Sequence, residues 1–207
     1  MTEIKICGLF RECDIESVND AKADYAGFII DFEKSHRNLS IKDATHLRNL
    51  LDKEIKAVGV FVNKPAEEVV KAAHEIGLDV IQLHGSEDGD YIRKVKEQSG
   101  LTIWKAFKIR STEDVKAANL SPADMILLDN GYGTGEVFDW SVVTKLDREF
   151  ILAGGLNEEN VALAIKNLCP AIVDISSGAE TDKLKDREKI NACVKAVRNI
   201  SSGGKDE

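Results

Sequence analysis

Residues 57–84, AVGVFVNKPAEEVVKAAHEIGLDVIQLH, carry the pattern that decides the fold. An apolar, β-branched run at 57–62 predicts a buried strand, and a second run of this kind follows at 80–84. The residues between them are typical of an amphipathic helix, because Pro65 suits its first turn and Gly77 suits its C-terminal cap. The segment therefore predicts a strand–helix–strand unit.

The same alternation extends along the whole chain. It predicts strands at 4–7, 25–30, 57–62, 80–84, 102–107, 125–129, 150–153 and 172–176. It predicts helices near 14–22, 40–52, 65–77, 87–99, 111–118, 140–146, 157–168 and 186–200. Eight short units of about 26 residues predict an α/β fold, a single-domain (β/α)8 TIM barrel. We expect the barrel to span residues 1–200 and the polar segment 201–207 to be a disordered tail.

A doubly wound open sheet is the main structural alternative. Such a sheet usually carries a glycine-rich phosphate loop after its first strand. Here the first strand is followed by Cys7-Gly8, which does not match that loop. The barrel is therefore the favoured fold.

Composition and charge exclude several classes of function. The 207 residues have a formal net charge of −8, and their Lys and Arg are dispersed, which argues against nucleic-acid or anionic-membrane partners. The sequence shows no apolar run near the roughly 20 residues that span a bilayer, and no secretory-signal pattern. The four cysteines form no CxxC pair or zinc-like cluster. We expect a cytoplasmic protein with free thiols, a small-molecule partner, no metal and no cofactor.

Function in such a barrel belongs to the C-terminal ends of the strands, where two segments are typical of phosphate binding. Gly154 and Gly155 lie between the seventh strand and a helix, and Ser176, Ser177 and Gly178 follow the eighth strand. Glycine lets backbone N–H groups approach a phosphate, and a helix N-terminus adds a favourable dipole. Tight turns alone would explain either segment, but the two together favour phosphate.

Cys7 and Asp129 are the candidate base and acid. Cys7 ends the first strand on the face that carries Lys5, whose charge would favour a thiolate, and Asp174 is a candidate anion for Lys5. Asp129 ends the sixth strand beside the glycine-rich run 131–135, an expected flap that would shield a general acid. The alternative interpretations are a small buried cysteine and an aspartate that caps a turn.

Four further polar residues are candidates for substrate binding, and one of them is Asp174, near the end of the eighth strand. Gln82 and His84 share one face of the fourth strand, at its C-terminal end. Arg37, in the loop after the second strand, could hold a carboxylate or a phosphate through two parallel hydrogen bonds. A solvated loop cation is the alternative interpretation of Arg37.

Together these motifs resemble the phosphoribosylanthranilate isomerase family. The resemblance rests on Lys5-Ile6-Cys7-Gly8, Gly27-Phe28, Ser35-His36-Arg37, Gln82-Leu83-His84-Gly85, Leu127-Leu128-Asp129, Thr134-Gly135, Phe138-Asp139-Trp140, Leu152-Ala153-Gly154-Gly155-Leu156, Asp174-Ile175-Ser176-Ser177-Gly178-Ala179-Glu180 and Lys185-Asp186. These motifs occur in family order over nearly the whole chain. The resemblance implies a cofactor-free Amadori rearrangement in tryptophan biosynthesis, which converts N-(5′-phosphoribosyl)anthranilate to 1-(2-carboxyphenylamino)-1-deoxyribulose 5-phosphate.

The resemblance also implies roles for individual residues. Asp129 would protonate the ring oxygen of the ribose, and Cys7 would remove the C2′ proton of the resulting Schiff base. Arg37 would face the anthranilate carboxylate, and the two glycine- and serine-containing segments would hold the phosphate. The chain departs from the family at His36, where proline is usual, and near Lys183, where glycine is frequent. We expect a monomer or a homodimer.

Other functions remain alternatives. The related isomerase of histidine biosynthesis uses two aspartates, so a cysteine at the end of the first strand argues against it. Pentulose-phosphate epimerases hold a metal with His and Asp, and the sequence shows no such cluster. A non-catalytic phosphate binder would not need Cys7 and Asp129 at strand ends. A thiol-redox role would need a resolving cysteine close to Cys7.

Overall fold

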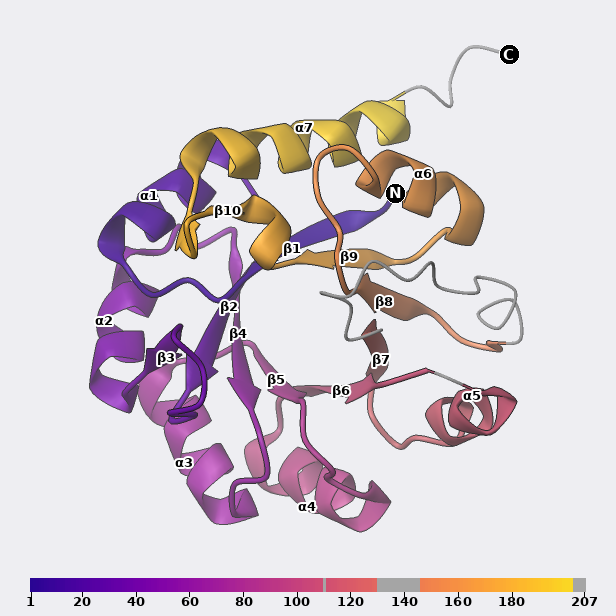
Figure 1. Ribbon diagram of the computed structural model, residues 1–207. Coiled ribbons are helices and arrows are strands. Elements are labelled where there is room, and N and C mark those ends of the chain that lie inside the picture. The colour runs from indigo at the N-terminus through magenta and orange to yellow at the C-terminus, as the bar shows by residue number, and fades with distance from the viewer. Residues whose placement is uncertain (110, 130–145, 203–207) are drawn as a thin grey trace.

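The computed structural model describes residues 1–109, 111–129 and 146–202. Within these ranges, parallel strands form a ring that is surrounded by helices (Figure 1). In order around the ring the strands are β1 (Glu3–Cys7), β2 (Tyr25–Ile30), β4 (Lys56–Phe61), β5 (Val80–Leu83), β6 (Thr102–Phe107), β7 (Met125–Asp129), β8 (Phe150–Ala153) and β9 (Ile172–Ile175). Because β1 pairs with both β2 and β9, the sheet closes. The predicted barrel is therefore confirmed, and the open sheet is excluded.

The strand predictions agree with the structure to within one residue at every boundary. Alternate residues of a barrel strand point inward or out toward the helices. The inner cluster is Tyr25, Val58, Val80, Trp104, Leu127, Ile151, Ala153 and Ile172. Its Tyr25 and Trp104 rings, from β2 and β6, meet edge to face at a centroid distance of 5.0 Å. Burial on both faces is the reason that the strands have nearly unbroken apolar sequences.

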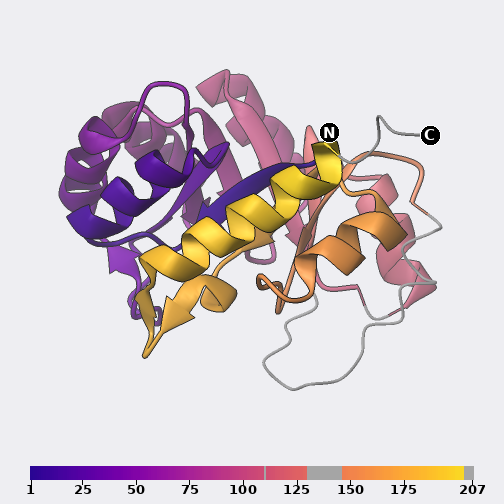
Figure 2. The same cartoon turned by 90° about the horizontal axis from the view of Figure 1, so that it is seen from above.

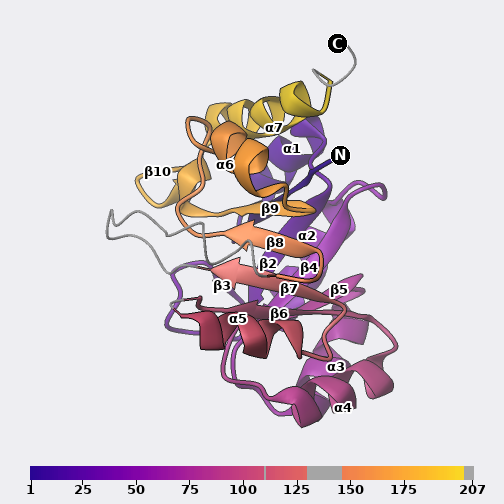
Figure 3. The same cartoon turned by 90° about the vertical axis from the view of Figure 1, so that its right-hand side faces the viewer.

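The helices cover the outside of the barrel (Figures 1 and 3). They are α1 (Glu12–Ala21), α2 (Ile41–Leu50), α3 (Ala66–Ile76), α4 (Gly89–Ser99), α5 (Thr112–Asn119), α6 (Val161–Leu168) and α7 (Arg187–Ser202). The Ser40 and Ser111 hydroxyls accept from backbone N–H groups at the N-termini of α2 and α5, and Gly77 and Gly100 end α3 and α4 in left-handed conformation, as predicted. Pro65 is the N-cap of α3 and precedes its first turn.

Most helix boundaries differ from prediction by no more than two residues, and the largest difference is at the start of α6. Helix α6 begins at Val161, four residues later than the predicted 157, because the Asn157 side chain accepts from the N–H groups of Glu159 and Asn160 and forms a turn. Helix α7 extends to Ser202, two residues past its predicted end. The predicted helix at 140–146 lies outside the described residues apart from its final position, as do the flap at 131–135 and positions 203–207 of the tail.

Four short elements lie at the C-terminal end of the barrel and were not predicted. Strand β3 (Asn38–Leu39) pairs with the end of β2. The 3₁₀ helix η2 (Ser177–Ala179) leads into an antiparallel hairpin of β10 (Glu180–Thr181) and β11 (Leu184–Lys185), beside the start of α7 (Figure 2). The hairpin turn holds Asp182 and Lys183 at φ 51° and 65°. This left-handed conformation favours glycine, which accounts for the family's frequent glycine near Lys183.

Candidate active site

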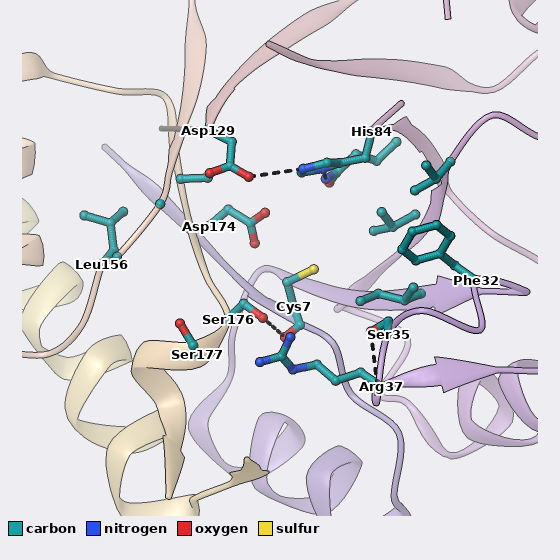
Figure 4. Close-up of a pocket in the computed structure, with 17 residues that line it drawn as sticks. Cys7, Phe32, Ser35, Arg37, His84, Asp129, Leu156, Asp174, Ser176 and Ser177 are labelled. Carbon is teal, nitrogen blue, oxygen red and sulfur yellow. Dashed lines mark hydrogen bonds and ion pairs between the residues drawn. The ribbon is translucent and has the colours of Figure 1, made fainter. Parts of the chain in front are cut away.

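A cavity of about 360 Å³ opens at the C-terminal ends of the strands (Figure 4). It brings together residues from both ends and the middle of the chain. Ten of the eleven site residues expected from the sequence line it, namely Cys7, Arg37, Gln82, His84, Asp129, Gly154, Gly155, Asp174, Ser176 and Ser177. The remaining one, Gly178, packs below the cavity, where a Cβ would lie 1.9 Å from the Leu156 carbonyl oxygen. Glycine at 178 thus brings the loops after β8 and β9 into contact.

The centre of the site is a buried ammonium group. The Lys5 Nζ donates to Asp174 Oδ2 and to Gln82 Oε1, at 2.8 Å in each case, and Lys5 is fully buried. This geometry confirms the predicted pairing of Lys5 with Asp174. Burial opposes the charge of Lys5, but the attraction of Asp174 and Cys7 outweighs it and raises the pKa of Lys5. The pairing therefore favours the charged form of Lys5, which lies behind the cavity-lining residues Gln82 and Asp174.

Cys7 lies beside this cation and is itself nearly enclosed, with 7% of its surface exposed. Burial raises the pKa of the Cys7 thiol, Lys5 opposes that shift, and Asp174 adds to it. Lys5 favours the thiolate, as expected, but the net pKa of Cys7 still lies above the ordinary thiol value, so the expectation of a pKa below that value is wrong. Desolvation of the anion exceeds the attraction of one cation, because that cation is already shared with a carboxylate.

A hydrogen-bonded chain runs from Lys5 to Asp129. Because Gln82 Oε1 accepts from Lys5, the amide Nε2 of Gln82 faces His84 Nδ1, at 3.1 Å. The His84 Nδ1 therefore accepts, and the imidazole proton lies on Nε2, which donates to Asp129 Oδ2 at 3.1 Å (Figure 4). The ammonium group thus sets the direction of each hydrogen bond up to the candidate acid.

The two predicted phosphate segments lie side by side on one wall of the cavity. Gly154 and Gly155 have φ values of 92° and 67°, a conformation that other residues rarely adopt. On the neighbouring segment the Ser176 hydroxyl donates to the Cys7 carbonyl, at 3.1 Å (Figure 4). This bond ties the loop after β9 to the end of β1. The wall consists of small residues and exposed backbone, a surface suited to an anion.

Arg37 reaches the cavity from the loop after β2, where its Nε and Nη2 donate to the two carboxylate oxygens of Glu180 at 2.6 and 2.7 Å. The adjoining His36 packs edge to face against Phe10, with ring centroids 6.3 Å apart, so the departure from proline is accommodated by an aromatic contact. The sequence analysis missed Glu180 and Lys185, which are buried beneath Arg37. The only sequence signal for them was their place within the family motifs.

Three other features bear on the class of protein. The described part of the chain holds no group of three or more His, Cys, Asp or Glu side chains placed for a metal ion. All four cysteines are free. Among the described helices, none has the length and apolar character needed to cross a membrane.

A thiol and a carboxyl group facing one cavity at the C-terminal end of a (β/α)8 barrel, beside two phosphate-type loops, define a barrel enzyme of acid–base chemistry. The family model described as N-(5′phosphoribosyl)anthranilate (PRA) isomerase matches residues 4–196. The chain therefore belongs to the N-(5′-phosphoribosyl)anthranilate isomerase family, and it is an isomerase. The resemblance seen in the sequence is confirmed.

Individual relatives support this assignment. The N-(5′-phosphoribosyl)anthranilate isomerase of Thermoanaerobacter pseudethanolicus is 45% identical over 207 residues, with 97% of this chain and 100% of the relative covered. That of Clostridium kluyveri is 46% identical over 203 residues, with the same coverage. The crystal structure of the Thermotoga maritima enzyme is 34% identical and superimposes with a TM-score of 0.85, covering 96% of this chain and 100% of that one.

A further solved relative contains a ligand. It is a phosphoribosyl anthranilate isomerase in complex with reduced 1-(o-carboxyphenylamino)-1-deoxyribulose 5-phosphate, and it is 33% identical to this chain with a TM-score of 0.84 over 96% of this chain and 100% of that one. By contrast, 3-hexulose-6-phosphate synthase of Salmonella typhimurium is only 14% identical, with a TM-score of 0.74, so it shares the fold alone.

Proposed function

We propose that this chain carries out the isomerisation of its family with Cys7 as the general base and Asp129 as the general acid. The reaction is the Amadori rearrangement of N-(5′-phosphoribosyl)anthranilate to 1-(2-carboxyphenylamino)-1-deoxyribulose 5-phosphate, a step of tryptophan biosynthesis. The observation that carries the proposal is that Cys7 and Asp129 face the same cavity from different strands (Figure 4). Such an arrangement allows the two groups to act on different atoms of one sugar.

In the proposed mechanism Asp129 gives one proton to the substrate and Cys7 takes one from it. Asp129 donates a proton to the ribose ring oxygen, the C1′–O bond breaks, and the nitrogen lone pair forms a Schiff base with C1′. Cys7, as the thiolate, removes the proton from C2′; the electrons of that C–H bond form the C1′=C2′ double bond, and the C1′=N electrons return to nitrogen. The resulting enol becomes the ketone when solvent takes the proton of the O2′ hydroxyl and supplies a proton to C1′. Solvent also returns a proton to Asp129 and removes one from Cys7, which restores both groups.

Four other side chains have proposed roles in substrate binding. Arg37 faces the anthranilate carboxylate. Asp174 Oδ1 is buried at the cavity and has no hydrogen-bond partner within the described ranges, so it can accept from a sugar hydroxyl. Gln82 and His84 border the sugar between Lys5 and the acid.

The phosphate is proposed to lie against the loops after β8 and β9. Gly154 and Gly155 leave their backbone open, and Ser176 and Ser177 line the same wall. Gly178 supports this wall through its contact with the preceding loop. A phosphate there would place the other end of the substrate across the cavity, toward the candidate acid and base.

The direct test is turnover of freshly prepared N-(5′-phosphoribosyl)anthranilate, followed by the loss of anthranilate fluorescence. We expect turnover by the wild-type chain without added metal or nucleotide, and the same rate after exhaustive treatment with EDTA. A rate lost to EDTA and restored by a divalent ion would replace the acid–base mechanism with a metal-assisted one.

We further propose that the chain acts as a monomer or a homodimer in the cytoplasm. A dimeric phosphoribosylanthranilate isomerase is described for Thermotoga maritima, which makes the homodimer the first state to test. Four free cysteines suit a reducing compartment. Sedimentation equilibrium of the purified chain measures the oligomeric state directly.

A further inference from the structure

A three-charge cluster beside the cavity joins Arg37 to Glu180 and Lys185, two residues that have no role in the mechanism given above. Glu180, on β10, accepts from Arg37 through both oxygens, and its Oε1 also accepts from Lys185 Nζ at 2.6 Å. The side chains of Glu180 and Lys185 are 6% and 0% exposed. Residues 180 and 185 are directly paired across the β10–β11 hairpin, so the hairpin places both charges at one point.

The cluster is not explained by stability alone, since burial lowers the pKa of Lys185 even beside Glu180. Burial opposes the charge of Glu180, but hydrogen bonds from Arg37 and Lys185 outweigh it and lower the pKa of that carboxyl group. Desolvation of buried ion pairs commonly offsets their attraction, so such a cluster adds little net stability compared with apolar packing. The arrangement of the three charges therefore points to a role other than stability.

The contacts of Glu180 fix the direction in which the Arg37 guanidinium group points. Its guanidinium group is planar, and Glu180 engages the edge formed by Nε and Nη2. The edge that carries Nη1 makes no hydrogen bond with any described residue, and Arg37 lines the cavity (Figure 4). Because the group is rigid, a partner that holds one edge also sets the direction of the other. The aliphatic part of the Arg37 side chain lies close against Gly8, since a Cβ at position 8 would be 2.4 Å from Arg37 Cδ.

The cluster also connects Arg37 to the candidate phosphate wall. Lys185 Nζ donates to the Ser176 carbonyl oxygen at 2.9 Å while it binds Glu180. One buried ammonium group therefore holds both the partner of Arg37 and the loop after β9. The distance between the two anion-binding parts of the site depends on this shared support.

We propose that Glu180 is a positioning residue that aims the open edge of Arg37 at the anthranilate carboxylate of the substrate. Lys185 holds Glu180 at a fixed position relative to the phosphate-binding loop, because it binds both. The inference rests on the proposed function and adds a residue that determines specificity for a substrate carrying that carboxylate.

The test combines variants of the protein with variants of the ligand. The proteins are the wild type, Glu180→Gln, Arg37→Ala and the double variant. The ligands are the reduced product, 1-(o-carboxyphenylamino)-1-deoxyribulose 5-phosphate, and the same compound without its carboxyl group. Dissociation constants are measured by titration, and KM and kcat are measured with the substrate. Glutamine keeps the size of Glu180, but its amide N–H₂ group cannot accept a hydrogen bond from Arg37.

We expect Glu180→Gln to weaken binding of the carboxylated ligand, and to raise KM, by about tenfold or more, the effect of losing one charge-assisted hydrogen bond. Its kcat should stay within about threefold of the wild type, because uniform binding acts on KM. Binding of the ligand without the carboxyl group should not change. In the Arg37→Ala background, Glu180→Gln should add no further loss.

Two controls separate positioning from folding. Glu180→Asp keeps the charge and retracts the carboxylate, so a folded variant with a smaller loss confined to the carboxylated ligand is expected. Asp24→Asn removes a carboxylate that binds Arg198 at the opposite end of the barrel, and it should change neither dissociation constant. Equal loss for both ligands, or additive loss with Arg37→Ala, would overturn the proposal. A wild type without turnover would instead refute the proposed function.

Discussion

The two ends of the barrel use aspartate in different ways. At the N-terminal end, Asp24, Asp79 and Asp124 each stand immediately before a strand, and each carboxylate accepts a hydrogen bond of 2.7 to 2.8 Å from a backbone N–H of an adjacent strand. The donors are Ile4, Ala57 and Ile103. These aspartates join neighbouring strands, and their role is in the fold.

At the C-terminal end, Asp129 and Asp174 bind the side chains of His84 and Lys5. The Lys5–Asp174 pair is almost fully enclosed, with side chains 0% and 7% exposed, whereas the Arg198–Asp24 pair at the opposite end is 35% and 25% exposed. The His84–Asp129 pair, however, is 30% and 22% exposed, similar to Arg198–Asp24, so burial singles out Lys5–Asp174 and not the whole C-terminal end. The comparison therefore separates aspartates that join strands from aspartates that are proposed to serve chemistry.

The largest expected effect comes from removing the candidate acid or base. Cys7→Ala and Asp129→Ala should each lower kcat by about 10²–10⁴-fold with folding largely intact, because each removes a positioned proton-transfer group. Cys7→Ser and Asp129→Asn should not restore activity, since a hydroxyl is a weak base and an amide cannot deliver a carboxylic proton. Stopped-flow or steady-state fluorescence gives kcat.

The matched control for Cys7 is Cys13→Ala, which removes an exposed thiol from α1. It should leave kcat and KM unchanged. If Cys7→Ala retained a kcat near the wild-type value, the C-terminal end would not contain the proposed base, and the mechanism would have to be abandoned.

Removal of Arg37 should have a smaller effect, and on a different constant. Arg37→Ala should raise KM by about tenfold or more and change kcat less, because a carboxylate clamp binds substrate and transition state alike. Full substrate-saturation curves separate the two constants. A variant with wild-type KM and kcat would make Arg37 a structural partner of Glu180 only.

The pH dependence of Cys7 labelling tests whether burial raises the pKa of a thiol at the C-terminal end of the barrel. Burial raises the pKa of this thiol, so its alkylation by iodoacetamide should increase with pH and reach its midpoint above the ordinary thiol value of about 8.5. Because Lys5 opposes the rise, Lys5→Met should move the midpoint higher still. Mass spectrometry resolves Cys7 from the other thiols, and a midpoint below 8.5 would mean that Lys5 outweighs burial.

The smallest effect on catalysis is expected at the N-terminal end. Asp24→Asn should lower the free energy of unfolding by about 1 kcal/mol, since it weakens hydrogen bonds to Arg198 and to the Ile4 backbone. Its kcat and KM should equal those of the wild type. Urea denaturation and the fluorescence assay measure the two quantities, and a loss of activity without a loss of stability would contradict the separation of the two ends.

The predictable part of this molecule is the part with a strong local signal. The strands were predicted to within one residue because strands buried on both faces are apolar throughout. The residues at their C-terminal ends could be placed near one another because a barrel brings those ends together. The short elements β3, β10 and β11 were missed, since two-residue strands carry no periodicity.

The sequence by itself therefore determined the barrel, the order of its strands and helices, and most of the residues that face the site. Only the tertiary structure decided how those residues interact. It joined Glu180 to Arg37 over a separation of 143 positions, and it raised the pKa of Cys7 although Lys5 lies beside it. The physical reason is that desolvation and pairing depend on every neighbour in space, whereas sequence periodicity reports only the direction of each side chain.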